Sequence, residues 1–290
     1  MTVDLAASIH ARLLNRAKAR GEDFNLILTR YAIERFLYRL SLVPARDIYW
    51  LKGALLFDLW FDVPHRPTRD ADFLGFGPAD GDVLANTMRE VCGVAVDDDG
   101  MQFDPASITI EDIRDDDRYG GLRVRLIGKL GNARCNLQLD VGYGDAVTPG
   151  PEEAIYPTLL DDQPPPRLRV YPRASVAAEK LEAIVSLGMA NSRMKDYFDL
   201  RALAQEGVLD AALFGDAIAA TFQRRRTELP KDVPLGLSDE FARDVAKRAQ
   251  WKAFLGKNRL DAPALDEVIA EVRRFVTEPL KLARQGKGTP

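Results

Sequence analysis

The stretch Ile48–Phe76 most constrains the fold, because strand, turn and helix signals follow one another closely within it. It reads IYWLKGALLFDLWFDVPHRPTRDADFLGF. Its bulky apolar start favours a buried strand, which Lys52-Gly53 interrupts, and Ala54–Trp60 then has helical spacing. A loop bracketed by prolines leads to Asp70 and Asp72, which open a second apolar run. The pattern predicts a strand, a tight turn, a short helix, a loop and another strand.

Asp70 and Asp72 are two residues apart, so on a strand their side chains project from the same face of the sheet. Two carboxylates in this arrangement repel each other unless a cation lies between them. Mg²⁺, a hard cation with oxygen ligands, suits such a pair. The alternative interpretation is an acidic turn that leads into an edge strand.

Bulk composition is that of a folded, water-soluble chain. Of the 290 residues, 46 % are hydrophobic and 29 % are charged, which is globular and neither disordered nor fibrous. No stretch approaches the roughly 20 apolar residues that cross a bilayer, and the start Met-Thr-Val-Asp lacks a signal-peptide pattern. We therefore expect no membrane partner and a cytoplasmic protein.

Cysteine and histidine are too sparse for several kinds of site. Cys92 and Cys135 are far apart and have no metal-ligand spacing, so we expect buried thiols in a reducing compartment. His10 and His65 are the chain's two histidines, which argues against a histidine-based zinc site or a serine triad.

Charge is distributed unevenly along the chain. The net charge is −4, which argues against a protein that coats nucleic acid. From Tyr171 to Pro290 there are 20 basic and 17 acidic residues, a balance of +3, so the first 170 residues carry −7. The C-terminal part could therefore meet an anionic polymer.

Two alternating runs predict a β-hairpin. In the first, Leu122–Leu126, apolar residues alternate with arginines; in the second, Leu137, Leu139 and Val141 share one face and leave Asp140 on the other. Asp140 is either an exposed-face residue or, next to a glycine-rich segment at the strand end, part of a site.

The remaining segments predict helices around this sheet and a helical second half. The acidic segments 97–99 and 111–117 are interpreted as solvated loops and strand ends, and the proline-rich segment 147–172 as an extended connection. We place the sheet-containing domain at 1–165 and the helical domain at 166–290. The expected helices are Leu5–Ala19, Phe24–Leu42, Asp80–Val91, Val176–Leu187 capped by Ser175, Asp196–Glu206, Ala211–Gln223, Glu240–Phe254 and Ala264–Leu282.

Five segments in order resemble the AbiEii/AbiGii family of nucleotidyltransferase-like toxins, which includes mycobacterial toxins that modify tRNA. They cover roughly Trp50 to Leu200, and in this chain they are LKGA at 51–54, HRPTRDAD at 65–72, LDVGYGD at 139–145, AEKL at 178–181 and KDYFDL at 195–200. Ala54 departs from the pattern, because many relatives have a second glycine there. A methyl group at this turn is expected to crowd a phosphate.

The resemblance implies an α+β architecture, the polymerase-beta-like nucleotidyltransferase fold, with a short mixed sheet, helices and an α-helical C-terminal domain. It implies transfer of a nucleotide from an NTP to an acceptor hydroxyl, with loss of pyrophosphate. In the family, tRNA ends are acceptors, and a separately encoded antitoxin is the partner of this type IV toxin–antitoxin system.

Each motif position then has an expected role and a simpler alternative. Asp70, Asp72 and Asp140 would hold Mg²⁺, in the manner of two-metal catalysis. Lys52-Gly53 would bring backbone N–H groups to a phosphate, or be an ordinary turn. Thr68 would donate its hydroxyl to the γ-phosphate, or stabilise the loop, and the adjacent Arg69 is assigned to the nucleotide as well.

Two further positions lie in the predicted helical part. Lys180 would reach the triphosphate from an amphipathic helix, or be a solvated lysine. Asp196, together with Asp199 one turn later, would orient Lys180 or the base, or Asp196 would be a helix N-cap.

The same residues permit other functions. A two-metal nuclease would use the same carboxylates but attack with water and shorten RNA. A non-catalytic nucleotide- or RNA-binding module could retain the fold, with Ala54 as its support. A third alternative transfers a nucleotide or phosphate to a protein.

Overall fold

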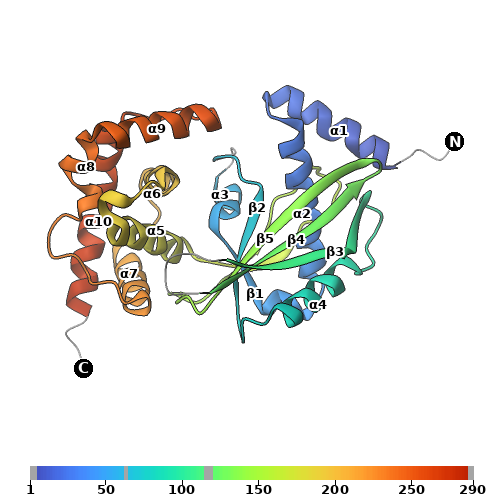
Figure 1. Cartoon of the computed structure of the whole chain (residues 1–290), viewed down its shortest axis with the longest axis horizontal. Coiled ribbons are helices and arrows are strands. Elements are labelled where there is room, and N and C mark those ends of the chain that lie inside the picture. Colours follow the sequence, from blue (N-terminus) through green and yellow to red (C-terminus); the bar gives the residue numbers. More distant parts are fainter. Residues whose placement is uncertain (1–4, 62–64, 114–119, 287–290) are drawn as a thin grey trace. The chain divides into compact units, whose positions relative to one another are not determined.

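Strand β2 (Asp70–Gly75) is the middle strand of a seven-stranded mixed sheet in a computed structural model that describes residues 5–61, 65–113 and 120–286 (Figure 1). The strand order within this described part is β3-β4-β5-β2-β1-β7-β6. The sheet belongs to the first of two units, which spans Met1–Gly144 and Glu152–Val170. The second unit spans Asp145–Pro151 and Tyr171–Pro290. The short mixed sheet with helices and a helical C-terminal region confirm the expected fold class.

The predicted strand and turn around Lys52-Gly53 are present. Strand β1 (Tyr49–Lys52) pairs antiparallel with β2, and a 3₁₀ turn (Gly53–Leu55) followed by the short helix α3 (Leu56–Trp60) replaces the single helix expected there. Strand β2 pairs in parallel with β5 on its other side.

The predicted hairpin is confirmed, and it is longer than expected. It consists of β4 (Gly121–Leu130) and β5 (Ala133–Tyr143), which pair antiparallel over their whole length. Leu137, Leu139 and Val141 are buried and Asp140 lies on the opposite face. Asp140 is not at the end of its strand, because β5 continues to Tyr143.

Three strands were missed, because none of them alternates clearly. Strand β3 (Met101–Ile113) has a register shift between Asp104 and Thr109. It includes residues 111–113 of the acidic segment 111–117, and the rest of that segment lies outside the described residues. Strands β6 (Glu152–Ile155) and β7 (Arg167–Val170) lie within the segment expected to be a connection. Leu168 and Val170 of β7 are buried, so the sheet extends past residue 165, where we expected the first domain to end.

Helices α1 (Leu5–Arg20), α2 (Phe24–Ser41) and α4 (Gly81–Cys92) complete the first unit, close to their predicted bounds. Helix α2 contacts β5, β7 and α4, and α4 contacts β3, so the two helices cover one face of the sheet (Figure 1). Asp23 and Asp80 cap α2 and α4 by accepting backbone N–H bonds.

Asp99 is not the solvated loop residue that the acidic segment 97–99 suggested. Its side chain is buried and accepts two bonds from the Arg39 guanidinium, at 2.7 and 3.0 Å. The hydroxyl of Tyr31 donates to the Asp99 carbonyl. A buried carboxylate persists here because a bidentate arginine compensates its lost hydration.

Glu34 is a second buried carboxylate, on α2. It accepts from Arg35 at 2.7 Å and from the backbone N–H of Leu159 at 2.6 Å. Burial raises the pKa of Glu34 from 4.5 to about 7 even though Arg35 and the Leu159 N–H lower it.

Folding stability is therefore expected to fall as the pH rises from about 5 to 7. In this window the folded protein keeps the Glu34 proton that the unfolded chain releases, and the raised pKa corresponds to up to about 3 kcal/mol. Urea denaturation of the wild type and Glu34→Gln at pH 5 and pH 8 measures this contribution. The wild type should lose stability relative to the variant at pH 8, and an unchanged difference would contradict the assignment.

Helices make up the second unit, with the core between α5, α6, α7 and α10. The helices are α5 (Arg173–Leu187), α6 (Met194–Glu206), α7 (Ala211–Arg225), α8 (Asp239–Arg243), α9 (Val245–Asn258) and α10 (Leu265–Gln285). None of the helices in the described ranges is long and apolar enough to cross a membrane.

Two helix predictions in this unit were wrong in detail. The single helix Glu240–Phe254 is divided at Asp244, which has an extended backbone and caps α9 by accepting from the Lys247 N–H. Ser175 does not cap α5, because the N-cap of this helix is Pro172. The Ser175 hydroxyl instead accepts from the backbone N–H of Thr148 and donates to the Thr148 carbonyl.

The surroundings of the two cysteine thiols agree with a structural role. Cys135 is buried and Cys92 half-buried, and neither forms a disulfide. Burial raises the pKa of both to about 11, so both thiols are protonated at neutral pH.

Candidate active site

Three carboxylates meet on the face of the sheet opposite α2 and α4. The parallel register of β2 and β5 pairs Asp72 with Asp140 and Asp70 with Gln138, and strand alternation directs all three aspartates to one face. One oxygen from each of Asp70, Asp72 and Asp140 lies within 4.8 Å of the others. All three are partly exposed. The expected convergence of these acids from two strands is therefore present.

Arg123 neutralises one member of this triad and was not among the predicted residues. It lies directly opposite Asp140 in the β4–β5 pairing, and its Nε and Nη2 donate to the two carboxylate oxygens at 2.8 and 2.7 Å. This hydrogen bond raises the pKa of Arg123 further. Gln138 donates to the same carboxylate at 3.3 Å. The hairpin alternation could have revealed Arg123, because the turn length determines which residue faces Asp140.

The loop residues before β2 orient the first aspartate. The Thr68 hydroxyl forms a short hydrogen bond with Asp70 Oδ1. Arg69 is largely exposed, and its guanidinium lies 3.5 Å from Asp23, the cap of α2. In this arrangement Thr68 holds the Asp70 carboxylate, and the nucleotide contacts of Thr68 and Arg69 stay predictions.

Gly53 supplies the space that Asp72 occupies. Lys52 is the Cα partner of Asp72 in the β1–β2 register, and Gly53 follows with φ +75°. A Cβ at Gly53 would lie 2.1 Å from Asp72 Oδ2. The turn therefore needs glycine both for its backbone conformation and for the close approach of the carboxylate.

Gly53→Ala is expected to reduce the nucleotide transfer that the family resemblance implies by about 100-fold and stability by about 1–3 kcal/mol, because it displaces Asp72 and strains the turn. Gly131→Ala is the matched control: its φ is +56° but the nearest atom to an added Cβ is 3.5 Å away. The control should lose stability and retain activity. Equal activity losses in the two variants would show that the contact with Asp72 is unimportant.

Lys180, Asp196 and Asp199 form a separate cluster within the second unit. Lys180 Nζ lies 3.2 Å from Asp196 Oδ1 and 2.6 Å from Asp199 Oδ2, and both aspartates are fully buried. Arg193 bonds the other Asp196 oxygen at 2.7 Å. Burial alone would raise the pKa of Asp196, but the charges of Lys180, Arg193 and Lys195 outweigh it and lower the pKa.

This geometry decides between the alternatives for these residues. Asp196 is inside α6, whose N-cap position is Arg193, so it is not the helix cap. Lys180 is 9 % exposed and is not a solvated lysine. Asp196 and Asp199 both lie within ion-pair distance of Lys180, whereas their role in orienting it for catalysis and its contact with a triphosphate stay predictions.

Comparison with known proteins identifies the family. Residues 35–273 match the family model described as nucleotidyl transferase AbiEii toxin, type IV toxin–antitoxin system. Among curated protein sequences, none matches the chain significantly.

Two solved structures share the fold. MenT4, a nucleotidyltransferase toxin from Mycobacterium tuberculosis H37Rv, is 21 % identical with a TM-score of 0.58, and the match covers 94 % of this chain and 89 % of that one. JHP933 from Helicobacter pylori is 16 % identical with a TM-score of 0.50, covering 90 % and 94 %. The family match spans most of the chain and includes the triad, the glycine turn and the Lys180 cluster. The chain belongs to the AbiEii family of type IV toxin–antitoxin nucleotidyltransferases.

Proposed function

We propose that the protein is an Mg²⁺-dependent toxin that transfers a nucleotide from an NTP to the 3′ hydroxyl of an RNA, with tRNA as the acceptor, and so blocks translation. The observation that carries this proposal is the convergence of Asp70, Asp72 and Asp140. Family membership supports a nucleotide substrate and an antitoxin partner.

The three carboxylates fit a magnesium ion. They supply hard oxygen donors, and oxygens bound to one Mg²⁺ at about 2.1 Å lie at most about 4 Å apart. The three oxygens lie within 4.8 Å of one another, slightly wider than this, and a bound ion would draw the partly exposed side chains together. A cation at the triad competes with Arg123 for Asp140, since both Asp140 oxygens accept from this guanidinium.

The proposed reaction is an in-line displacement at the α-phosphorus. The acceptor oxygen forms a bond to the α-phosphorus, the bond to the bridging oxygen breaks, pyrophosphate leaves, and the hydroxyl proton is released to solvent. When bound, Mg²⁺ would neutralise phosphate charge and favour the deprotonated hydroxyl.

The chain's own residues position these groups. Thr68 orients Asp70, Gly53 leaves room for Asp72, and Arg123 fixes Asp140. The contacts of Thr68 and Gly53 preorganise Asp70 and Asp72 and so reduce the rearrangement needed to reach the transition state, whereas Asp140 would have to exchange Arg123 for the cation. Lys52, Gly53, Thr68 and Arg69 are the proposed phosphate contacts in the first unit, and Lys180 is the proposed contact in the second unit.

A transfer assay tests the function against its alternatives. The purified chain is incubated with Mg²⁺, each α-labelled NTP and total cellular RNA and protein, with EDTA as the control. Labelled, lengthened tRNA that disappears with EDTA would support the proposal. Shortened RNA would indicate a nuclease, and labelled protein would indicate a protein-directed transferase. The absence of any product would indicate a binding module. Each of these three outcomes would overturn the proposed function.

A further inference from the structure

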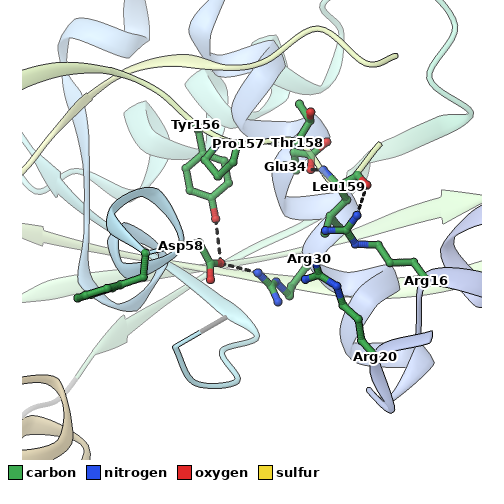
Figure 2. Close-up of a pocket in the computed structure, with 10 residues that line it drawn as sticks. Arg16, Arg20, Arg30, Glu34, Asp58, Tyr156, Pro157, Thr158 and Leu159 are labelled. Carbon is green, nitrogen blue, oxygen red and sulfur yellow. Dashed lines mark hydrogen bonds and ion pairs between the residues drawn. The ribbon is translucent and has the colours of Figure 1, made fainter. Parts of the chain in front are cut away.

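A cavity in the first unit, outside the acidic triad, is lined on one side by three arginines. It has a volume of about 100 Å³ and lies between α1, α2, α3 and the segment 156–159. Arg16 and Arg20 come from α1 and Arg30 from α2. In Figure 2 the three guanidinium groups lie near one another, and that of Arg30 points toward Asp58.

The two acids of the cavity already have other partners. Asp58 accepts from Arg30 at 2.7 Å and from the Tyr156 hydroxyl at 3.3 Å (Figure 2). Glu34 is held by Arg35, outside the cavity, and by the Leu159 backbone N–H. Neither carboxylate forms an ion pair with Arg16 or Arg20 in the described residues, although the charge of Arg16 lowers the pKa of Glu34.

Arg16 and Arg20 have no carboxylate partner within the described part of the chain. Arg16 donates one N–H to the Leu159 carbonyl at 2.9 Å, and its buried Nε has no partner. Arg20 is exposed and forms no hydrogen bond or ion pair there. A buried guanidinium N–H without an acceptor is unfavourable.

Like charges add to this cost. Burial lowers the pKa of Arg16, the charges of Arg20 and Arg30 lower it further, and nearby Glu22 and Asp161 offset the shift only in part. Arginine stays cationic in proteins. The repulsion between these cations is therefore relieved by an incoming anion.

We propose that this cavity binds one phosphate group of a polynucleotide, with Arg16 and Arg20 as its ligands. Guanidinium forks match the geometry of phosphate oxygens, and the volume admits a phosphate group but not a nucleoside. The identity of the polynucleotide as the RNA acceptor rests on the proposed function. The triphosphate of the NTP has its own proposed contacts at Lys52 and Gly53, so this second site serves the acceptor.

The net charge of the first unit means that an RNA would need a local cationic anchor there. Residues 1–170 carry −7, and without the −1 of Asp145, which lies in the second unit, the first unit carries −6, so this unit as a whole repels a polyanion. Local cations without carboxylate partners provide an anchor on that surface. An RNA phosphate held there would fix the register of the acceptor strand without reading its sequence.

The test measures binding without chemistry, using the full chain and a 5′-fluorescent 12-nucleotide single-stranded RNA in the absence of Mg²⁺ and NTP. Arg16→Gln and Arg20→Gln are compared with Lys18→Gln, an exposed lysine of the same helix that does not line the cavity. We expect about 5- to 10-fold weaker binding for each arginine variant and less than about 2-fold for the control. The slope of log affinity against log salt should fall by about 0.7 for a lost phosphate contact.

Two further measurements identify the source of the phosphate. At matched ionic strength, inorganic phosphate should raise the Tm of the wild type and not that of the double arginine variant. A fluorescent NTP analogue should bind both proteins equally. Weakened NTP binding with unchanged RNA binding would overturn the assignment to the acceptor, and unchanged binding of both would overturn the site.

The outcome is separable from that of the proposed function, because no transfer is measured. If the wild type transfers no nucleotide but the arginine variants lose RNA and phosphate binding, the cavity assignment holds and the transferase proposal fails. Arg20 is exposed and has no partner to lose, so Arg20→Gln remains a valid test even if Arg16→Gln unfolds.

Discussion

Asp70→Asn is expected to lower nucleotide transfer by about 1,000-fold or more and to leave the fold intact. Asparagine retains the shape of the side chain and an oxygen that accepts from Thr68, but it removes one of three negative charges from the proposed metal site. Loss of several kcal/mol of charge stabilisation in the transition state corresponds to at least three decades in rate. Initial rates with saturating NTP and Mg²⁺ measure the effect.

Stability and a matched variant complete this experiment. Removal of one of three crowded carboxylates relieves repulsion, so the Tm of Asp70→Asn should equal or exceed that of the wild type. Asp112→Asn is the control, an exposed aspartate on β3 outside the triad, and should retain full activity. Activity of Asp70→Asn above a tenth of the wild-type rate, or failure to fold, would refute the proposed role.

Lys180→Met is expected to lower the free energy of unfolding by about 3–5 kcal/mol, because it leaves the buried carboxylates of Asp196 and Asp199 without their shared cation. Arg193 still neutralises Asp196, so most of the cost falls on Asp199. Urea denaturation measures the loss. Lys252→Met, an exposed lysine on α9 outside the cluster, should change stability by less than about 0.5 kcal/mol.

A double variant separates the electrostatic cause from lost packing. Asp199→Asn in the Lys180→Met background removes the uncompensated charge and should restore part of the stability, which additive effects would not produce. The proposed nucleotide contact is tested at a temperature where Lys180→Met is folded. Activity that tracks the folded fraction alone would assign Lys180 a purely structural role.

Local sequence was sufficient for features set by side-chain periodicity and by single turns. The spacing of Asp70 and Asp72, the alternation of the 122–141 hairpin and the glycine after β1 each depend on neighbouring residues, and each is present in the structure. The hairpin sequence was also sufficient to predict that Arg123 faces Asp140, because the short turn determines the register of the two strands.

Features without a local signature were missed. Strands β6 and β7 have four residues each, too few to show a period beside prolines, and β3 carries a register shift that disturbs its alternation. Asp99 and Glu34 are buried because arginines distant or adjacent in sequence compensate them. Burial of a charge depends on its partner in space, which the sequence around it does not reveal.

By itself, the sequence determined the family, the class of fold and the residues from which a metal site could be built, because motif order and alternation are properties of the chain. Tertiary structure alone decided that β2 lies beside β5 in parallel, which brings Asp140 next to Asp72. It also decided that Lys180 lies between two buried aspartates and that Arg16 and Arg20 line one cavity. Such distances depend on strand register and helix packing. Both are set by contacts between residues far apart in the sequence, which bury apolar surface against one another.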